Sequence, residues 1–528
     1  MASSMGLNHL TGLNTASVSF PATHRRWNGG ARFNNLKIYA SDTKQQEPDL
    51  SVNVNGLHMP NPFAIGSGPP GTNYKVMKKA FDEGWGAVIA KTNKERKKRE
   101  KKERRNIDID ISRELKTELK HIAFCIAASS KLWDTRKEYI KLWWRPGETR
   151  GTVWLDKHVK IKPNESLPEI HISQETSQFP YTNRQGHKSA IRLSRIVSEA
   201  LKLGLTNVRW FVMGDDDTVF VVENIVRVLN KYDHNQFYYI GSSSESHFQN
   251  IFFSYSMAYG GGGFAISYPL VKELAKMQDR CIKRYPGLYG SDDRMQACMA
   301  ELNVPLTREP GFHQNDVYGN LLGLLSGHPV TPLVSLHHFD VVDPIFPGMK
   351  RVESLKHLLH SAEYDSASLV QQSICYDKKR KWSILVSWGF TVQIMRGILS
   401  PRELETPSRT FINWYKVLDF TAYAFNTRPV SGHPCQKPFV FYVNSTRYDN
   451  VRKQIIGIYT VHKERHPRCS WKTESPEKIH TVVVLKQEDP DRWQRAPRKD
   501  CCRVLPSSKE GIMYLWVGHC RQNEVIEV

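Results

Sequence analysis

The chain has 528 residues, of which 40% are hydrophobic, so it is long enough and apolar enough to form two or more domains with a sizeable core. Its formal net charge at pH 7 is +21. The uncharged residues 249–271 contain four consecutive glycines, and the apolar residues 382–395 are too few to cross a bilayer. The composition therefore argues against a transmembrane segment in this sequence.

The first 41 residues have a distinct composition. They are rich in Ser, Thr, Ala and Asn, they lack Asp and Glu, and they contain Arg25, Arg26, Arg32 and Lys37. This pattern is typical of an organelle transit peptide, and the apolar core of a secretory signal is missing. We therefore expect a plastid-type leader at residues 1–41, with a disordered tail of accidental composition as the alternative.

Residues 49–92 read as a strand, a Gly/Pro-rich loop, a helix and a strand. They closely resemble the start of the plant chloroplastic dihydropyrimidine dehydrogenases, flavin enzymes with a (β/α)8 barrel. In that family the loop Ser67 to Thr72 and Lys91 approach the FMN. The similarity stops at Thr92, and a barrel of this kind needs roughly 250 residues. We therefore expect an incomplete barrel fragment from a fused or misjoined gene, with no FMN and no pyrimidine reduction.

A basic run follows at residues 94–105, with nine basic and three acidic residues. Such a run could bind nucleic acid or direct nuclear import. No aromatic residue interleaves it to stack on bases, which favours a solvated linker over residues 93–118. No nucleic-acid partner is expected.

From residue 119 the pattern alternates between strands and helices, which predicts an α/β fold with a mainly parallel sheet. The ligand crevice of such a sheet lies at the carboxyl ends of its strands. The predicted elements are a strand at 119–129, a helix at 135–144, a strand at 151–156, a helix at 189–204 and a strand that begins at 208.

Three adjacent carboxylates, Asp215, Asp216 and Asp217, follow the last of these strands. They repel one another, so holding them together after a buried strand is costly unless a cation compensates. Oxygen-rich sites suit Mg²⁺ or Mn²⁺. The triplet therefore predicts a metal site, and a solvated turn is the alternative.

Several further motifs stand in a fixed order around the triplet: 133–144 (WDTRKEYIKLWW), 259–267 (YGGGGFAIS), 290–305 (GSDDRMQACMAELNVP), 309–320 (EPGFHQNDVYGN) and 332–340 (PLVSLHHFD). With them, residues 119–350 resemble a plant branch of the Fringe-related β-1,3-glycosyltransferases, and the similarity extends to the C-terminus. The resemblance implies a GT-A-like nucleotide-sugar-binding domain, a UDP-sugar donor, a glycan or glycoconjugate acceptor and a Mn²⁺ or Mg²⁺ ion. Residues 351–528 are expected to form a small β-rich region of unknown role.

The resemblance also implies roles for single residues. Asp217 would be the direct metal ligand, joined by Asp215 and by His337, with His338 as its alternative. Asp215 and Asp216 would face the ribose of the donor and the water shell of the ion. Trp133 and Arg136 would contact the donor, although Arg136 could equally pair with a surface acid.

Inversion at the anomeric carbon needs a base that is distinct from the metal ligands. The acidic pair at the start of the helix after Gly290 supplies it, with Asp293 preferred and Asp292 as the fallback. Either acid could instead cap the helix. The glycines Gly261, Gly262 and Gly263 would let the backbone approach the bound sugars, or they form a flexible turn.

The expected function is a metal-dependent inverting glycosyltransferase that forms a β-1,3 linkage. The alternatives are a non-catalytic fusion product and a flavin-dependent dihydropyrimidine dehydrogenase. Six late cysteines make disulfides plausible, and sequons at Asn164 and Asn444 point the same way. The leader suggests the chloroplast whereas the family implies the Golgi membrane or lumen, so the location stays open.

Overall fold

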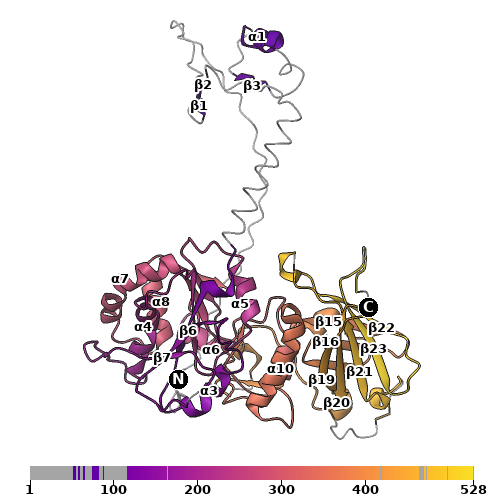
Figure 1. Cartoon of the computed structure of the whole chain (residues 1–528). Coiled ribbons are helices and arrows are strands. Elements are labelled where there is room, and N and C mark those ends of the chain that lie inside the picture. The colour runs from indigo at the N-terminus through magenta and orange to yellow at the C-terminus, as the bar shows by residue number, and fades with distance from the viewer. Residues whose placement is uncertain are drawn as a thin grey trace, which may run out of the picture. The chain divides into compact units, whose positions relative to one another are not determined.

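The computed structural model describes residues 52–54, 57–59, 64–65, 74–82, 87–88 and 116–528, without 163, 417–418, 463–468, 471–472, 496 and 527. One compact unit spans Leu115–Val528, and the N-terminal elements belong to a second unit (Figure 1). The predicted leader, the loop Ser67 to Thr72, Lys91 and the basic run at 94–105 lie outside the described residues.

The N-terminal unit contains the predicted barrel-like fragment. Strands β1 (Val52–Val54) and β2 (Leu57–Met59) pair antiparallel. Strand β3 (Ala64–Ile65) is followed by helix α1 (Tyr74–Asp82) and by β4 (Ala87–Val88), which pairs parallel with β3. The order of strand, helix and parallel strand is that of one barrel repeat.

A seven-stranded sheet organises the first part of the larger unit. Its strands, in spatial order, are β12 (Leu306–Arg308), β10 (Tyr239–Gly241), β11 (Phe264–Ser267), β8 (Trp210–Asp215), β5 (Ile122–Ala127), β6 (Arg150–Leu155) and β7 (Glu169–Ile172). Strands β8, β5, β6 and β7 run parallel, and β11 is antiparallel to both of its neighbours. The predicted α/β class and mainly parallel sheet are thus confirmed.

Helices cover both faces of this sheet, because alternate residues of a buried strand point to opposite sides. On β5, Phe124 faces a core shared with α3 (Trp133–Ile140) and α5 (Val222–Leu229). Its neighbour Cys125 faces a second core, which includes residues of α4 (Ser189–Leu201), α7 (Tyr268–Arg284) and α8 (Ser291–Glu301). The remaining helices are α6 (His247–Phe252), α9 (Leu322–Ser326), α10 (Arg351–Asp365) and α11 (Pro401–Glu405).

The C-terminal region is β-rich, as predicted, but its sheet is larger than expected. Eight strands follow in the order β15 (Gln372–Asp377), β16 (Trp382–Ser387), β17 (Thr391–Arg396), β19 (Phe439–Asp449), β20 (Gln454–Val461), β21 (Thr481–Lys486), β23 (Ile512–Gly518) and β22 (Cys501–Leu505). The edge strands β15 and β22 contact each other and carry the disulfide Cys375–Cys502. Helix α10 packs on β19 (Figure 1).

The two sheets belong to one folded body rather than to a domain with a loose appendage. A single hydrophobic core contains Phe124 and Phe220 from the first part of the unit and Trp388 and Val484 from the second. Strand β18 (Phe411–Asn413), which follows the first three strands of the C-terminal sheet, pairs antiparallel with β13 (Val317–Gly319). The C-terminal region therefore reaches back to the segment that follows α8.

The cysteines form four disulfides. All six late cysteines are paired, as Cys375–Cys502, Cys435–Cys469 and Cys501–Cys520. A fourth bond, Cys281–Cys298, joins α7 to α8 and was missed because neither cysteine lies in the C-terminal cluster. Cys125 is buried and is the one free cysteine of the described chain. Among the residues that the structure describes, no helix is both long and apolar enough to cross a membrane.

Candidate functional site

The acidic triplet lies at the carboxyl end of β8, as predicted. The strand ends at Asp215, whose backbone N–H donates to the Thr218 hydroxyl (2.7 Å), and that hydroxyl donates to the Gly261 carbonyl (2.7 Å). This tight turn directs the next two acids inward. Asp216 is 3% exposed and Asp217 is fully buried.

His337 reaches the triplet through a short strand pair. It directly follows β14 (Ser335–Leu336), which pairs antiparallel with β9 (Val219–Phe220), the strand after the triplet. Its Nε2 lies 3.1 Å from Asp217 Oδ1 and 3.8 Å from Asp215 Oδ2. Its carbonyl accepts a hydrogen bond from Asn315 Nδ2, and its Nδ1 lies 3.2 Å from the Gln314 carbonyl.

Asp215, Asp217 and His337 form a cluster that could hold a metal ion. One ligand atom from each lies within 4.8 Å of the others. Within the described chain, the buried Asp217 Oδ2 has no hydrogen-bond partner. A buried carboxylate oxygen without a partner is costly, and a cation would compensate it. Carboxylate ligands suit Mg²⁺ and Mn²⁺, so the two acids are compatible with the Mn²⁺ or Mg²⁺ ion that the resemblance implies, and the identity of the ion stays a prediction.

Arg136 bridges the acids of the triplet to a fourth acid. Its Nη1 donates to Asp216 Oδ1 (2.9 Å) and Asp217 Oδ1 (3.1 Å), and its Nη2 donates to Asp340 Oδ2 (2.8 Å). Tyr139 also donates to Asp340. The charge of Arg136 thus offsets the negative charge of the buried Asp216 and Asp217. It also pairs with the more exposed Asp340, as in the alternative in which it pairs with a surface acid.

The pKa values of the two buried acids, Asp216 and Asp217, are shifted in opposite directions from the usual value of an aspartate. Burial raises the pKa of Asp216 to about 6, and the Asp217 charge adds to this increase. Burial also opposes ionisation of Asp217, but His337 and Arg136 outweigh it and hold the pKa of Asp217 below its usual value. For His337, burial disfavours the charged form, yet the Asp217 carboxylate raises its pKa. Asp217 is therefore the anionic centre of the cluster.

The two acids at the start of α8 have different surroundings. Asp293 accepts backbone N–H groups from Tyr289 (2.7 Å), Gly290 (2.9 Å) and Arg294 (2.9 Å), so it caps the helix. Asp292 instead lies against Gly260, beside the glycine run. Burial raises the pKa of Asp292 to about 6; the Gly260 N–H opposes this shift and Asp215 adds to it. The choice of Asp293 or Asp292 as the base stays a prediction, and the two acids differ in that Asp293 is occupied by three backbone N–H groups of its own helix.

The glycine run packs against protein side chains in this structure. A Cβ on Gly260 would lie 2.6 Å from Asp292 Oδ1, and one on Gly261 would lie 2.1 Å from His337 Cε1. The Gly262 N–H donates to Gln314 Oε1 (2.6 Å). Gly263 has φ +83°, a backbone conformation that favours glycine. The absence of side chains at Gly260 and Gly261 thus leaves room for Asp292 and His337, and a close approach to bound sugars stays a prediction.

Replacing Gly261 by Ala is expected to push the His337 ring out of place and to weaken Mn²⁺ binding about 10- to 100-fold, as for other groups that orient metal ligands. The added Cβ would meet three ring atoms at 2.1–2.5 Å. Isothermal titration with Mn²⁺ in the presence of UDP measures the effect. Gly432→Ala is the matched control, because no atom lies within 4 Å of that position. Equal affinity in the two variants would contradict the contact.

The remaining predicted donor residue, Trp133, lies in the hydrophobic core and is 1% exposed. It therefore has the weakest structural support of the set. Sequence reasoning missed Arg192 on α4, which Asp156, Asp215 and Asp216 stabilise in its charged form although burial lowers its pKa. Its Nε is buried without a partner among the described residues. Arg192 lies three residues before Arg195 on the same helix, and this spacing gave no signal in the sequence.

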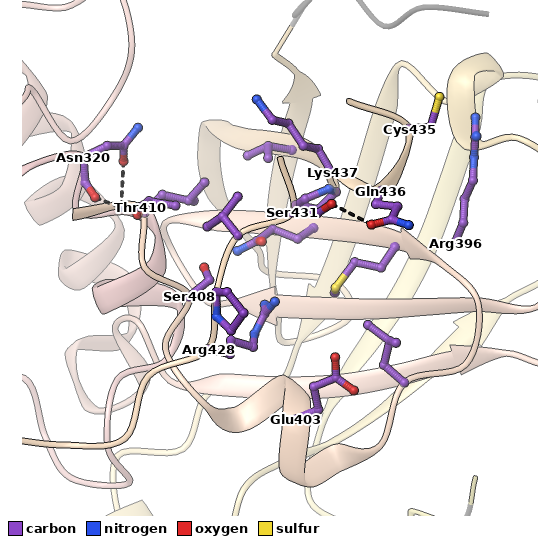
Figure 2. Close-up of a pocket in the computed structure, with 18 residues that line it drawn as sticks. Asn320, Arg396, Glu403, Ser408, Thr410, Arg428, Ser431, Cys435, Gln436 and Lys437 are labelled. Atoms are coloured by element: carbon purple, nitrogen blue, oxygen red, sulfur yellow. Dashed lines mark hydrogen bonds between the residues drawn. The ribbon is translucent and has the colours of Figure 1, made fainter. Parts of the chain in front are cut away.

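A separate cavity of about 370 Å³ lies in the C-terminal region (Figure 2). Its polar lining includes Arg396, Arg428, Lys437 and Glu403. None of the residues predicted for the metal, donor or base positions is among the described residues that line it. The candidate site is therefore the cluster at the end of β8 and not this cavity.

Two family models match overlapping parts of the larger unit. Residues 117–323 match the model of the family described as Fringe-like, and residues 249–502 match that of a protein family of unknown function, DUF604. The human β-1,3-glucosyltransferase is 27% identical over 180 residues, which are 34% of this chain and 33% of that protein. The mouse protein of the same name is 28% identical over 162 residues, 31% of this chain and 32% of that protein.

The N-terminal resemblance is also borne out. The chloroplastic dihydropyrimidine dehydrogenase (NADP(+)) of Arabidopsis thaliana is 60% identical over 93 residues, which are 17% of this chain and 21% of that enzyme. The chain thus spans about a fifth of that relative and about a third of the glucosyltransferases. The stretch that matches the Fringe-like family model, residues 117–323, contains the acidic triplet and the α8 acids.

Proposed function

We propose that the Fringe-like part of the chain, residues 119–350, has a GT-A fold and transfers a sugar from a UDP-sugar to an acceptor hydroxyl with inversion, forming a β-1,3 linkage. The observation that carries this proposal is the Asp215, Asp217 and His337 cluster, with its unpartnered buried Asp217 oxygen, at the carboxyl end of a parallel strand. The likeness to β-1,3-glucosyltransferases over this part of the chain supports the reaction class.

Different residues of the site would bind the metal ion and the sugar donor in such a transfer. Asp215, Asp217 and His337 would hold Mn²⁺, which when bound supplies positive charge against the leaving diphosphate. Arg192 offers a further positive charge beside the acids, and its unpartnered Nε can donate to a donor oxygen. Asp216 would face the donor ribose, although in this structure its two oxygens accept from the Arg136 guanidinium (2.9 Å) and the Ser129 N–H (3.1 Å).

Asp292 is the proposed base. It accepts the proton of the acceptor hydroxyl while that oxygen forms its bond to the anomeric carbon, and the bond from that carbon to the UDP oxygen breaks on the opposite face. UDP leaves with the bonding electron pair, so charge and atoms balance. A carboxylate with a pKa of about 6 is ionised at pH 7 yet basic enough to share the proton in the transition state.

The location is proposed from the cysteines. Four disulfides in the larger unit favour an oxidising compartment, such as the Golgi lumen that the family implies. The transit-like start favours the plastid instead. Sequencing transcripts across the junction between Thr92 and Asn93 decides whether one message encodes both parts. A non-catalytic fusion product is the alternative function, whereas the chain's 21% coverage of dihydropyrimidine dehydrogenase does not support pyrimidine reduction.

The test of the proposed function is release of UDP from a panel of UDP-sugars by the purified, oxidised chain. We expect one UDP-sugar to be hydrolysed slowly with Mn²⁺ and to be protected by EDTA, and a glycan acceptor to accelerate UDP release. Failure of the chain to bind UDP with Mn²⁺, or UDP release that is indifferent to EDTA, would refute the metal-dependent transferase.

A further inference from the structure

One aromatic residue of the C-terminal region, Trp414, lies beside the cluster of Asp215, Asp217 and His337. Strand β18 pairs with β13 so that Asn413 lies opposite Val317. Trp414 directly follows Asn413, and Val317 directly follows Asp316, which belongs to the segment that holds His337. This long-range pairing brings Trp414 to residues that are far from it in the sequence.

Trp414 forms a stack with two other rings. Its ring is nearly parallel to that of His338 (4.7 Å between centroids, 8°) and to that of Tyr318 (5.0 Å, 10°). The Lys416 ammonium lies 4.7 Å from the centre of the Tyr318 ring. Trp414 is partly exposed, and its ring contacts the rings of His338 and Tyr318.

His338 is the residue that this stack constrains. It has φ +58°, a left-handed conformation that is unfavourable for a residue other than glycine and persists only where the surroundings enforce it. Its Nδ1 lies 3.1 Å from Asp316 Oδ1 but without the geometry of a hydrogen bond, whereas the Ser244 hydroxyl donates to Asp316. The Asp316 carboxylate and the stacked Trp414 ring thus both lie against the imidazole, and the stack is the better-defined of the two contacts.

The orientation of His337 depends on this constraint. The two histidines are adjacent in the chain, and their ring centroids are 4.0 Å apart. If His338 relaxed from its left-handed conformation, the direction of the chain at His337 would change, and Nε2 would leave its position 3.1 Å from Asp217. A shift of this size matters, because metal ligands must be held in place by the groups behind them.

We propose that Trp414 of the C-terminal region is a positioning residue for the metal site: by stacking on His338 it holds His337 against Asp217. This inference rests on the proposed function for the identity of the site. The β-rich region would then contribute to the site, because its Trp414 supports the residue next to a proposed metal ligand. Trp414 contacts no proposed metal ligand directly and acts through its neighbour.

The experiment compares Trp414→Phe with Trp414→Leu in the full chain and measures Mn²⁺ affinity by isothermal titration in the presence of UDP. Both side chains are apolar and fill part of the same space, but only Phe offers a flat ring to His338. We expect Trp414→Leu to weaken Mn²⁺ binding about tenfold or more and Trp414→Phe to stay within about threefold of the parental chain. A residue that only fills space would give the same result in both variants.

Trp516→Leu is the matched control, because Trp516 is also partly exposed and stacks on a charged side chain, Arg503, in the C-terminal sheet. It should leave Mn²⁺ affinity unchanged. Parental affinity in a folded Trp414→Leu chain, or equal losses in the Leu and Phe variants, would overturn the positioning role alone. Absence of Mn²⁺ binding in the parental chain would instead refute the proposed function, and this inference with it.

Discussion

Asp217→Asn is expected to remove Mn²⁺-dependent UDP release, with a fall of at least about 10³-fold. Asp217 is fully buried, and one of its oxygens faces His337 while the other has no partner among the described residues. Loss of the ligand removes several kcal/mol of charge stabilisation from the leaving diphosphate, and each ~1.4 kcal/mol is a factor of ten in rate. UDP release and Mn²⁺ titration measure the two losses together.

The fold should survive this substitution. The amide keeps the shape of the side chain, and Arg136 retains Asp216 and Asp340 as partners. Asp489→Asn is a matched control: Asp489, Asp500 and His519 form the other cluster of potential ligands in the described residues, but Arg495 and Arg492 already neutralise its two acids. Metal binding that survives in Asp217→Asn but fails in Asp489→Asn would move the site to the C-terminal sheet.

The parts of the site that could be predicted are those encoded by local pattern. The apolar run before Asp215 predicts a buried strand, and three acids at its carboxyl end need a cation wherever the rest of the chain lies. The predicted strands β5, β6 and β8 and the helix α4 were found for the same reason, a clear period of hydrophobic residues. The role of His337 came only from the family resemblance, which left His338 as the alternative.

The choice between Asp292 and Asp293 could not be made from the sequence. Both acids lie in the first turn of α8, where a cap and a base have the same composition. Their separation depends on which of them faces Gly260, and that is set by packing of α8 against α4 and α7. Trp414, Asp340 and Arg192 were missed for a related reason, because each joins the site through contacts between residues distant in the sequence.

Composition predicted only part of the structure of the C-terminal region. The sequence predicted a β-rich region over residues 351–528, and strands such as β20 and β21 are present there. The sequence did not reveal that the edge strands of this sheet meet at a disulfide, nor that β18 leaves the sheet to pair with β13. Strand partners that are distant in the sequence carry no local signal, so the sequence predicted the β-rich character of this region but not its pairing with β13.

Asp292→Asn is expected to leave UDP and Mn²⁺ binding intact and to lower sugar transfer by roughly 10²- to 10⁴-fold, the usual cost of losing a general base. The amide fits the same space but cannot accept the proton of the acceptor hydroxyl. The pH dependence gives a second signature. Because burial raises the pKa of Asp292 to about 6, the parental rate should fall as the pH drops below about 6, where the base becomes protonated. Asp292→Asn should lack this dependence over the same range.

Asp293→Asn separates the base from the helix cap. Asp293 accepts three backbone N–H groups at the start of α8, so its substitution should lower the free energy of unfolding by about 0.5–2 kcal/mol, measured by denaturant titration. Transfer at saturating substrate should stay within a fewfold of the parental rate, because the side chain is turned to its own helix. If Asp293→Asn instead loses transfer while Asp292→Asn keeps both its rate and its dependence on pH, the base is Asp293, and the carboxylate beside Gly260 serves only to pack α8 against the glycine run.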